Sequence, residues 1–507
     1  MHTSVARALA FQSMGEVAGG VVDWRPMPDL ALADAISQAA LVREGVLSAT
    51  ELAQAAIERV QRMEPALGFL VEPLFEQALE AAQLVDRERP LGPLAGAPML
   101  VKDHLATIAG VRHSEGSAFL REYIAPADSE LVRRYRRAGL VIVGTTSTPE
   151  FALASTTEPV LYGPTRNPWD PERIPGGSSG ASAAAVAVGV VPVAHGNDSG
   201  GSLRIPASCC GVFGFKPTRA RNSLAPYGDI GGIWVEHVIT RSVRDSAAVL
   251  DATCGPVGGD PYAAPVRAGT FLERTATDPD RLRVCFTATP PSGATVAGEC
   301  VAAVEAAAEL CASLGHEVDR AAPELDWAAA EDAFLSVFTA ACAAWVDAWA
   351  RRLGREPREG ELEPYTRALA TAGRRVSAPE LLGCVELLQQ AGRATDRFFE
   401  RYDVLLNPTL GDVPPPLGYF DPPPPPADAF DLLALDARFT PFCWVANATG
   451  QPAASLPLHW TPDGLPVGVM ATARFGDEAT LFALAAQLER AQPWAGRRPP
   501  LHAAAVA

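Results

Sequence analysis

Two glycine- and serine-rich segments have the residue types and spacing that nucleophilic catalysis could use in this 507-residue chain. They read GGSSG at 176–180 and HGNDSGGSLR at 195–204, which makes Ser178, Ser199 and Ser202 candidates. A serine hydroxyl is a weak nucleophile until an adjacent base removes its proton. The chemistry that these residues suggest is therefore acyl transfer to a serine, and it requires a base elsewhere in the chain.

Lysine is a candidate for that base because it is rare here. The chain has 42 lysine and arginine residues together, of which only Lys102 and Lys216 are lysines. Arginine stays protonated in proteins, whereas a buried lysine can lose its proton and act as a general base. Lys102 follows the apolar run 97–101, and its alternative role is a simple ion pair with Asp103. Lys216 is predicted to form a structural salt bridge.

Ser199 lies in Asp-Ser-Gly-Gly, the sequence found around the nucleophile of chymotrypsin-type proteases. Such a protease needs a catalytic histidine and then an aspartate before the serine. His104 and His113 precede Ser199, but neither lies in the strand sequence expected around such a histidine. The nine cysteines also lack the pairing of a secreted protease, so this interpretation is disfavoured.

The segment GGSSG also matches Gly-x-Ser-x-Gly, the nucleophile elbow of α/β-hydrolases, with Ser178 at its centre. His459 could then act as the base, but WDPERIP (169–175) precedes the segment where an elbow requires a buried strand. A third possibility is that both loops are non-catalytic, or bind an anion where a helix begins near Ala181. No Walker-type Gly-Lys-Ser/Thr sequence supports a nucleotide.

A fourth interpretation combines both serine loops with the rare lysine: Ser202 is the nucleophile, Ser178 is a relay and Lys102 is the base. A hydroxyl donates and accepts a hydrogen bond at once, so Ser178 could pass a proton between the other two. Glycines around both loops would allow close backbone approach. This interpretation needs neither a histidine nor a metal.

At these residues the sequence resembles the amidase signature family. GGSSGASAAAVAVG (176–189) followed by GNDSGGSLRIPA (196–207) is similar to the family's signature, and VKD (101–103) is similar to its lysine motif. Ser178 and Ser202 are 24 residues apart, as in the family. The similarity covers about 94–250 and resumes through 402–410 and 447–460 to the C-terminal helix, whereas 260–400 resembles the family only loosely.

The resemblance implies specific roles for these residues. Ser202 would form the acyl-enzyme, Ser178 would relay the proton and follow a cis peptide bond, and Lys102 would be the base. The oxyanion hole would be built from four backbone N–H groups, those of Ser199, Gly200, Gly201 and Ser202. Positions that brace the loops match Ser179, Asp198 and Arg204. Ala181 departs from the family's usual glycine and adds a methyl group beside the relay loop.

The activity that the resemblance implies is that of an amidohydrolase, acting on carbon–nitrogen bonds other than peptide bonds without a metal or cofactor. The segments HGNDSGGSLRIPASCCGVFGFKPTR (195–219) and VEHVITRSVRDSAAVLDATCGP (235–256) resemble the branch with 6-aminohexanoate-cyclic-dimer hydrolases and related broad amidases. This resemblance suggests a small, mostly uncharged linear or cyclic amide, or an aryl or carbamate analogue. One alternative is a glutamine-dependent amidotransferase A-type subunit, which would need partner chains. Another is a non-catalytic binding protein of the same fold.

Short apolar runs alternate with helical patterns, which predicts an α/β fold. Strands are expected at 97–101, 140–144, 190–194 and 465–473, and helices at 181–189 and 477–491. A capping box at Ser48–Glu51 starts a helix within an N-terminal helical part. The resemblance implies a central mixed, twisted β-sheet covered by helices on both faces, in a single domain over 1–507. Its predicted parts are N-terminal helices (about 28–90), a signature core (about 94–250) and a divergent, largely helical substrate-side region (about 320–445).

Aromatic side chains and prolines distinguish the substrate-side region. Eight aromatic residues could line an apolar cleft there, although packing in the helical core is the more common use of such residues. They are Trp327, Phe334, Phe338, Trp345, Trp349, Phe439, Phe442 and Trp444. The proline-rich stretch 413–430 is predicted to be an extended surface connection.

The net charge of −17 disfavours binding to nucleic acid or to an anionic membrane surface. The first twenty residues lack the apolar core of a secretory signal, and the apolar stretch 183–194 is too short to span a bilayer, so the protein is expected in the cytoplasm. The scattered cysteines and histidines have no metal-ligand spacing, which predicts buried free thiols. A small-molecule substrate is expected, and a homodimer is compatible with the sequence.

Overall fold

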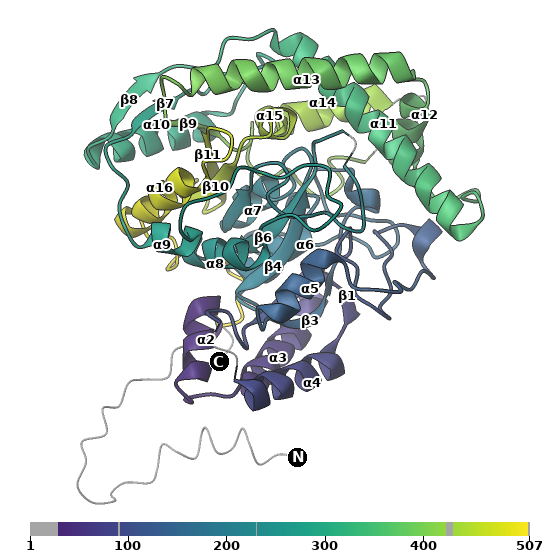
Figure 1. Cartoon of the computed structure of the whole chain (residues 1–507), viewed down its shortest axis with the longest axis vertical. Helices are drawn as coiled ribbons and strands as arrows, with labels where there is room; N and C mark the ends of the chain where they lie inside the picture. Colours follow the sequence, from purple (N-terminus) through teal and green to yellow (C-terminus); the bar gives the residue numbers. More distant parts are fainter. Residues whose placement is uncertain (1–28, 90–91, 230, 422–428, 505–507) are drawn as a thin grey trace, which may run out of the picture.

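A computed structural model describes residues 29–89, 92–229, 231–421 and 429–504 (Figure 1). Within them, one mixed sheet has eleven strands in the order β1-β3-β2-β4-β6-β5-β10-β11-β9-β7-β8. The pairs β3–β2, β2–β4, β9–β7 and β7–β8 are parallel and the other pairs are antiparallel. The strands are β1 (Leu70–Pro73), β2 (Pro98–Lys102), β3 (Val141–Thr146), β4 (Val193–Asp198), β5 (Phe213–Lys216), β6 (Val235–Thr240), β7 (Arg283–Phe286), β8 (Glu317–Arg320), β9 (Val404–Pro408), β10 (Ala453–Trp460) and β11 (Pro466–Ala473).

Helices cover both faces of the sheet, which confirms the predicted α/β class. One face carries α3 (Ala49–Leu67), α4 (Phe75–Glu88), α6 (Gly180–Ala187) and α7 (Arg204–Cys210). The other carries α5 (Glu130–Arg137), α8 (Val243–Thr253), α9 (Phe271–Thr275), α10 (Gly298–Ser313) and α16 (Glu478–Ala491). Elsewhere lie α2 (Ala35–Arg43) and the short 3-10 helices η1 (Ala118–Leu120) and η2 (Glu150–Ala152). The extent of a single domain over 1–507 stays a prediction.

The central strands are buried on both faces, which explains their continuous apolar sequences. Successive side chains of a strand point to opposite faces. On β2, Leu100 therefore packs in the core beneath α3 and α6, whereas Met99 and Val101 pack in the core beneath α5 and α8. The strands predicted at 97–101, 140–144 and 465–473 are confirmed to within two residues.

The strand expected at 190–194 begins three residues later than predicted. β4 covers Val193–Asp198, so it starts just after Pro192, which has no N–H to donate to a neighbouring strand. The strand thereby includes the polar residues His195, Asn197 and Asp198, which the sequence analysis had placed beyond it. This shift puts Asn197 and Asp198 at the carboxyl end of a buried strand, beside the end of β2.

The predicted N-terminal helices are present as α2, α3 and α4, with the short strand β1 between the last two. The capping box of α3 is confirmed, because the Glu51 N–H donates to Ser48 Oγ at 3.1 Å and the Ser48 N–H donates to Glu51 Oε2 at 2.8 Å. The helices predicted at 181–189 and 477–491 correspond to α6 and α16.

A helical layer lies at the upper end of the molecule in Figure 1, where α11 to α14 are drawn. It comprises α11 (Trp327–Leu353), α12 (Pro364–Gly373), α13 (Ala378–Phe398), α14 (Ala429–Phe439) and α15 (Cys443–Thr449). Of the described helices, α11 alone is long and apolar enough to cross a membrane, and half of its most apolar stretch is buried inside the protein. The predicted extended connection over 413–430 ends where α14 begins, and its residues 422–428 lie outside the described ranges.

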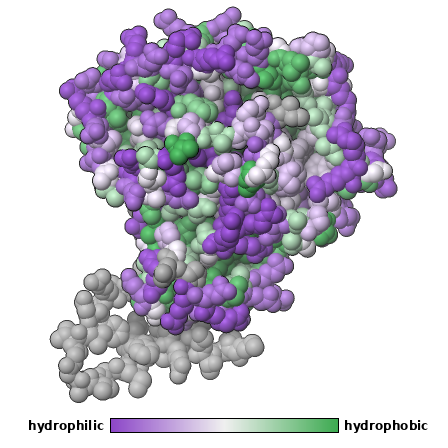
Figure 2. All heavy atoms as spheres, in the orientation of Figure 1, coloured by the Kyte–Doolittle hydropathy of each residue, from purple (hydrophilic) through white to green (hydrophobic). Residues whose placement is uncertain are grey.

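The hydrophilic residues at the surface and the free cysteines are those expected from the amino-acid composition. Figure 2 shows hydrophilic residues along much of the outer rim of the molecule, with more hydrophobic residues toward the middle of this view. The nine cysteines are free, and seven of them are buried, as predicted. In the described part of the chain, no group of three or more His, Cys, Asp or Glu side chains is arranged to hold a metal ion.

Candidate active site

Four segments bring the predicted site residues to one edge of the sheet. Lys102 ends β2, and the parallel strand β4 ends beside it at Asp198. Ser178 and Ser179 precede α6, and Ser202 lies two residues before α7. The carboxyl ends of parallel strands are where α/β proteins commonly place their functional groups. The Gly177–Ser178 peptide bond is cis, as the family resemblance implies.

The amine of Lys102 is fully buried and touches three polar side chains. Its Nζ lies 2.6 Å from Ser178 Oγ, 2.7 Å from Asn197 Oδ1 and 3.1 Å from Ser179 Oγ. Burial lowers the pKa of Lys102 well below its usual value, against the opposing effect of the carboxylate of Asp198. Lys102 does not pair with Asp103, which accepts hydrogen bonds from Ser114 instead.

The three contacts fix where the lone pair of a neutral Lys102 must point. A neutral amine has two N–H groups and one lone pair. Asn197 Oδ1 only accepts, so it takes one N–H. The Ser179 hydroxyl donates to the backbone carbonyl of Asn197 at 3.3 Å, so its oxygen accepts the second N–H. The lone pair is left for the O–H of Ser178, and that hydroxyl oxygen can in turn accept a proton from a nucleophile.

The activity is expected to follow the deprotonation of Lys102. Because the neutral amine is the reactive form, kcat/KM should fall about tenfold per pH unit below the lowered pKa of Lys102 and stay flat above it. Carbon-13 labelling of the lysine Cε atoms checks the assignment, since the chain has only two lysines and a Lys102→Met variant identifies the signal. A Lys102 signal that titrates at the ordinary lysine pKa of about 10.4 would contradict this prediction.

Ser202 is nearly buried and lines a cavity of about 640 Å³, here named the serine pocket. The same pocket is lined by Ser199 and Gly200. In the described part of the chain, the N–H groups of Ser199, Gly200 and Ser202 donate to no backbone or side-chain acceptor, so they are free to bind a substrate oxygen. The Gly201 N–H differs from the prediction, because it already donates to Asp198 Oδ1 at 2.8 Å.

The conformation of Gly201 explains why this position is a glycine. Its φ is +134°, a region that favours glycine, and a Cβ atom there would lie 2.6 Å from Cys443 Cβ. At Gly200, by contrast, an added Cβ would meet only Phe334 Cζ, at 3.7 Å. Gly200 therefore faces the open serine pocket, whereas Gly201 faces packed protein.

Asp198 and Arg204 form a buried ion pair behind the Ser202 loop. Arg204 Nη2 lies 2.9 Å from Asp198 Oδ1, and both side chains are inaccessible to solvent. The carboxylate also accepts from the N–H groups of Gly201 and Leu203. Burial would raise the pKa of Asp198, but Arg204 outweighs it and holds the pKa below its usual value. The pair thus fixes the backbone on both sides of Ser202.

Removing the cation of this pair is expected to destabilise the fold. Arg204→Met should lower the free energy of unfolding by roughly 3–5 kcal/mol, because it leaves the Asp198 carboxylate buried without its partner. Urea unfolding followed by circular dichroism measures the loss. The control is Arg133→Met, which removes a half-exposed partner of Glu130 while Arg134 and Arg137 remain paired with it, and should cost less than about 1 kcal/mol. Equal losses in the two variants would contradict the role given to Arg204.

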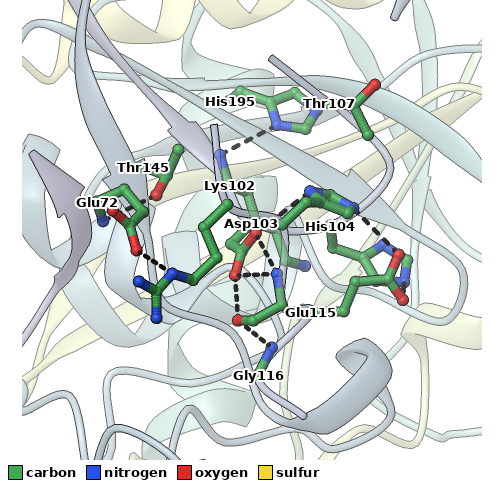
Figure 3. Close-up of polar contacts among 12 residues, drawn as sticks. Glu72, Lys102, Asp103, His104, Thr107, Glu115, Gly116, Thr145 and His195 are labelled. Atoms are coloured by element: carbon green, nitrogen blue, oxygen red, sulfur yellow. Dashed lines mark hydrogen bonds and ion pairs between the residues drawn. The ribbon is translucent and has the colours of Figure 1, made fainter. Parts of the chain in front are cut away.

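A second group of buried charges lies beside Lys102, on the loop that follows β2 (Figure 3). The His113 ring lies between two carboxylates, with Nδ1 3.2 Å from Asp103 Oδ1 and Nε2 3.2 Å from Glu115 Oε1. Burial alone would lower the pKa of His113, but these carboxylates raise it to about 9. Glu115 also accepts from the indole of Trp345 at 2.7 Å.

Lys216 does not form the predicted salt bridge. Its Nζ donates to the backbone carbonyl of Pro217 at 2.9 Å, and no carboxylate in the described residues lies within 4 Å of it. Burial lowers the pKa of Lys216 well below its usual value. The sequence suggested an ion pair because lysine is usually charged, but in the described residues Asp198 and Glu478 act on the buried amine only from beyond contact distance.

The aromatic residues of the helical layer divide between pocket and core. The serine pocket is lined by Phe334, Phe338 and Trp444. A neighbouring cavity of about 470 Å³, here named the histidine pocket, is lined by His104, Asn197, Trp234, Phe338 and Trp345. The two pockets share Ala152, Leu153, Ser199 and Phe338. The remaining predicted aromatics lie elsewhere: Trp349 and Phe439 pack in the core, and Trp327 and Phe442 line a separate cavity.

Backbone strain is concentrated around these two pockets. Leu105, Glu115, Phe151 and Ala152 have positive φ values between 51° and 63° although none is glycine. Such conformations cost of order 1–3 kcal/mol each and cluster at functional sites. Leu105, Phe151 and Ala152 line the histidine pocket, and Glu115 lies directly behind it.

Several residues of the site were missed by the sequence analysis. Asn197 lies inside the motif HGNDSGGSLR (195–204), and its position three residues after the predicted apolar strand 190–194 was a signal that it could face Lys102. Glu331 and Asp436 are carboxylic acids that line the serine pocket. Burial raises the pKa of Asp436 to about 6 and also raises the pKa of Glu331. Their approach to Ser202 depends on how α11 and α14 fold over the sheet, which local sequence does not specify.

Comparison with known proteins gives consistent matches over nearly the whole chain. A family model described as Amidase matches residues 51–482. The 6-aminohexanoate-cyclic-dimer hydrolase of Paenarthrobacter ureafaciens is 38% identical over 487 residues, covering 92% of this chain and 96% of that protein. A solved structure of 6-aminohexanoate cyclic dimer hydrolase with substrate is similar at a TM-score of 0.86 and 36% identity, covering 94% of this chain and 100% of that one. A bacterial aryl acylamidase matches at a TM-score of 0.82 and 26% identity, covering 91% and 97%.

Proposed function

Because the chain belongs to the amidase signature family and is an amidohydrolase, we propose that it cleaves small linear or cyclic carboxylic amides through an acyl-enzyme on Ser202. The observation that carries the proposal is the buried Lys102 amine, 2.6 Å from Ser178 Oγ, in surroundings that favour its neutral form. A neutral amine there can act as a base at ordinary pH, as catalysis by serine requires.

In the first half of the reaction, Ser202 Oγ attacks the amide carbonyl carbon. Its proton passes to Ser178 Oγ while the Ser178 proton passes to Lys102 Nζ. The carbonyl oxygen becomes an oxyanion that accepts hydrogen bonds from the N–H groups of Ser199, Gly200 and Ser202. Each such donor contributes about 3 kcal/mol to transition-state stabilisation. The Gly201 N–H is held by Asp198 and shapes the loop.

In the second half, the proton returns from Lys102 through Ser178 to the nitrogen of the leaving amine, and the carbon–nitrogen bond breaks. Water then attacks the acyl carbon of Ser202 and loses its proton along the same route. As the ester bond breaks, the proton returns from Lys102 through Ser178 to Ser202 Oγ, the carboxylic acid leaves, and Lys102 is again neutral. The scheme requires no metal or cofactor.

The lining of the pockets supports a mostly uncharged substrate that carries N–H groups. Aromatic and aliphatic side chains form most of both walls, and the lining of both pockets, drawn from the described residues, contains neither lysine nor arginine. The carboxyl groups of Glu331 and Asp436 could accept hydrogen bonds from a second amide N–H, away from the bond that is cleaved. A compact cyclic or linear diamide, the chemistry named for the cyclic-dimer hydrolases, combines these features.

A panel of amides tests the proposal. Purified protein would be incubated with cyclic diamides, linear diamides, anilides and glutamine, and the products identified by mass spectrometry, with the Ser202→Ala variant as control. Hydrolysis of the diamides by the wild-type protein, and not by Ser202→Ala, supports the proposal. Turnover of glutamine only, and only when partner chains are added, would instead favour the amidotransferase alternative. We also propose a cytoplasmic location and a homodimer.

A further inference from the structure

The ring of the buried His104 contacts Asn197 beside Lys102, and it has no hydrogen bond to the Lys102 amine within the described residues. We infer that the side chain of His104 is a positioning residue, which acts through the amide of Asn197 to direct the lone pair of Lys102 toward Ser178. The inference rests on the proposed function and adds a residue to it. Figure 3 shows His104 two residues beyond Lys102, beside Glu115.

The orientation of the Asn197 amide is fixed by atoms on both of its sides. Nδ2 lies 3.3 Å from the backbone carbonyl oxygen of His104, which can only accept a hydrogen bond. The amide nitrogen must therefore face His104, and Oδ1 must face Lys102 at 2.7 Å. In the opposite orientation an N–H would point at Lys102 Nζ and compete with Ser178 for the lone pair.

The His104 ring completes this arrangement as an acceptor. Its Nδ1 lies 2.9 Å from Asn197 Nδ2, so Nδ1 must be unprotonated and the proton of a neutral ring must reside on Nε2. Nε2 has no hydrogen-bond partner in the described part of the chain, and the nearest carboxylate oxygen, Glu115 Oε2, is 3.9 Å away. A second proton on His104 would oppose the N–H of Asn197.

The surroundings keep His104 neutral while its neighbour carries the charge. Burial lowers the pKa of His104 well below its usual value, and the cationic forms of Lys102, His113 and His195 lower it further. His113 holds a proton between Asp103 and Glu115 instead. The charged and titratable groups around His104 and Asn197 are Lys102 at the end of β2, Asp103, His113 and Glu115 on the following loop, His195 and Asp198 on β4, and Glu236 on β6.

A matched pair of variants separates positioning from packing. Asparagine and leucine have nearly the same shape, so His104→Asn and His104→Leu remove the same ring from the histidine pocket. Both variants keep the backbone carbonyl of residue 104, but only asparagine keeps a side-chain acceptor for Asn197 Nδ2. We expect kcat of His104→Leu to be about tenfold to hundredfold below that of His104→Asn, because a misdirected catalytic group costs rate on this scale. KM should differ much less between the two.

The titration of Lys102 provides a readout that does not depend on turnover. A hydrogen bond to Asn197 Oδ1 stabilises the ammonium form more than the amine, since charged donors make the stronger bonds. Loss of the fixed acceptor should therefore move the titration of Lys102, and the acid limb of kcat/KM, to lower pH in His104→Leu than in His104→Asn. The Cε signal of labelled Lys102 measures this shift directly.

Asn197→Leu tests the route of the effect. It should lower kcat and shift the Lys102 titration by itself, and His104→Leu should have little further effect on either in that background. If the His104 variants do not fold, Asn197→Leu still tests the inference. A Lys102 titration in this variant equal to that of the wild type would refute it. Equal kcat and equal Lys102 titration in His104→Asn and His104→Leu, or additive losses in the double variant, would also overturn it.

Failure of the proposed function and failure of the role given to His104 would produce different results. If wild-type protein hydrolyses no amide in the panel, the proposed function fails, and the Lys102 signals of the two His104 variants still report whether His104 directs Asn197. If the wild type is active and the matched variants behave alike, the proposed function stands and the inference about His104 is wrong.

Discussion

Replacing Ser202 with alanine should reduce amide hydrolysis by roughly four to six orders of magnitude while leaving the fold intact. The substitution removes the proposed nucleophile and no backbone contact, since the loop is held by Asp198 through the N–H groups of Gly201 and Leu203. Steady-state kinetics on the best amide of the panel measures the loss. Unfolding by urea should give the same midpoint for the variant and the wild type.

Ser199→Ala is the matched control for this prediction. Ser199 occupies the place of a protease nucleophile in Asp-Ser-Gly-Gly, and the account uses only its backbone N–H. Its loss of kcat should therefore be far smaller than that of Ser202→Ala. If Ser199→Ala loses activity and Ser202→Ala keeps it, the nucleophile is Ser199 and the assignment to Ser202 is wrong.

Replacing Lys102 with arginine should lower kcat by about three orders of magnitude or more, although arginine is also a basic residue. Arginine cannot give up its proton in a protein, so it cannot accept one from Ser178. Lys102→Met should lose a similar amount, because it too lacks a base. Comparison of these two variants shows whether basicity or charge is required.

The other lysine provides the control. Lys216 is equally buried and its pKa is also lowered, but its Nζ contacts only the backbone carbonyl of Pro217 among the described residues. Lys216→Met is expected to lower stability while retaining kcat within about tenfold, since it lies outside the proton route. Normal turnover by folded Lys102→Arg would contradict the role of Lys102 as the base.

The sequence was most informative where local residues determine the structure. The rarity of lysine pointed to Lys102, and the resemblance to the amidase signature family pointed to Ser178 and Ser202, which the fold places near the ends of β2 and β4. The start of β4 was predicted three residues too early, because the apolar run 190–194 continues through Pro192 and conceals the strand's polar end. Strand formation at Asn197 reflects its pairing with Glu236 of β6, which is a tertiary effect.

The walls of the pockets could not be predicted in the same way. Glu331, Phe338 and Asp436 reach the serine pocket only because α11 and α14 fold over the sheet from distant parts of the chain. Of the eight aromatic residues considered, sequence periodicity could not separate those that line a pocket from those that pack in the core. The Gly201 N–H was assigned to the oxyanion hole by resemblance, whereas its bond to Asp198 depends on the local loop geometry.

The central claim is that Ser202 carries the acyl group during turnover. Wild-type protein mixed with a slowly hydrolysed amide would be quenched in acid, digested and mapped by mass spectrometry. The account predicts an added acyl mass on the peptide that contains Ser202, and no such mass in Ser202→Ala or Lys102→Met. An acyl mass on Ser178 or Ser199, or one on Ser202 that persists undiminished in Lys102→Met, would contradict it.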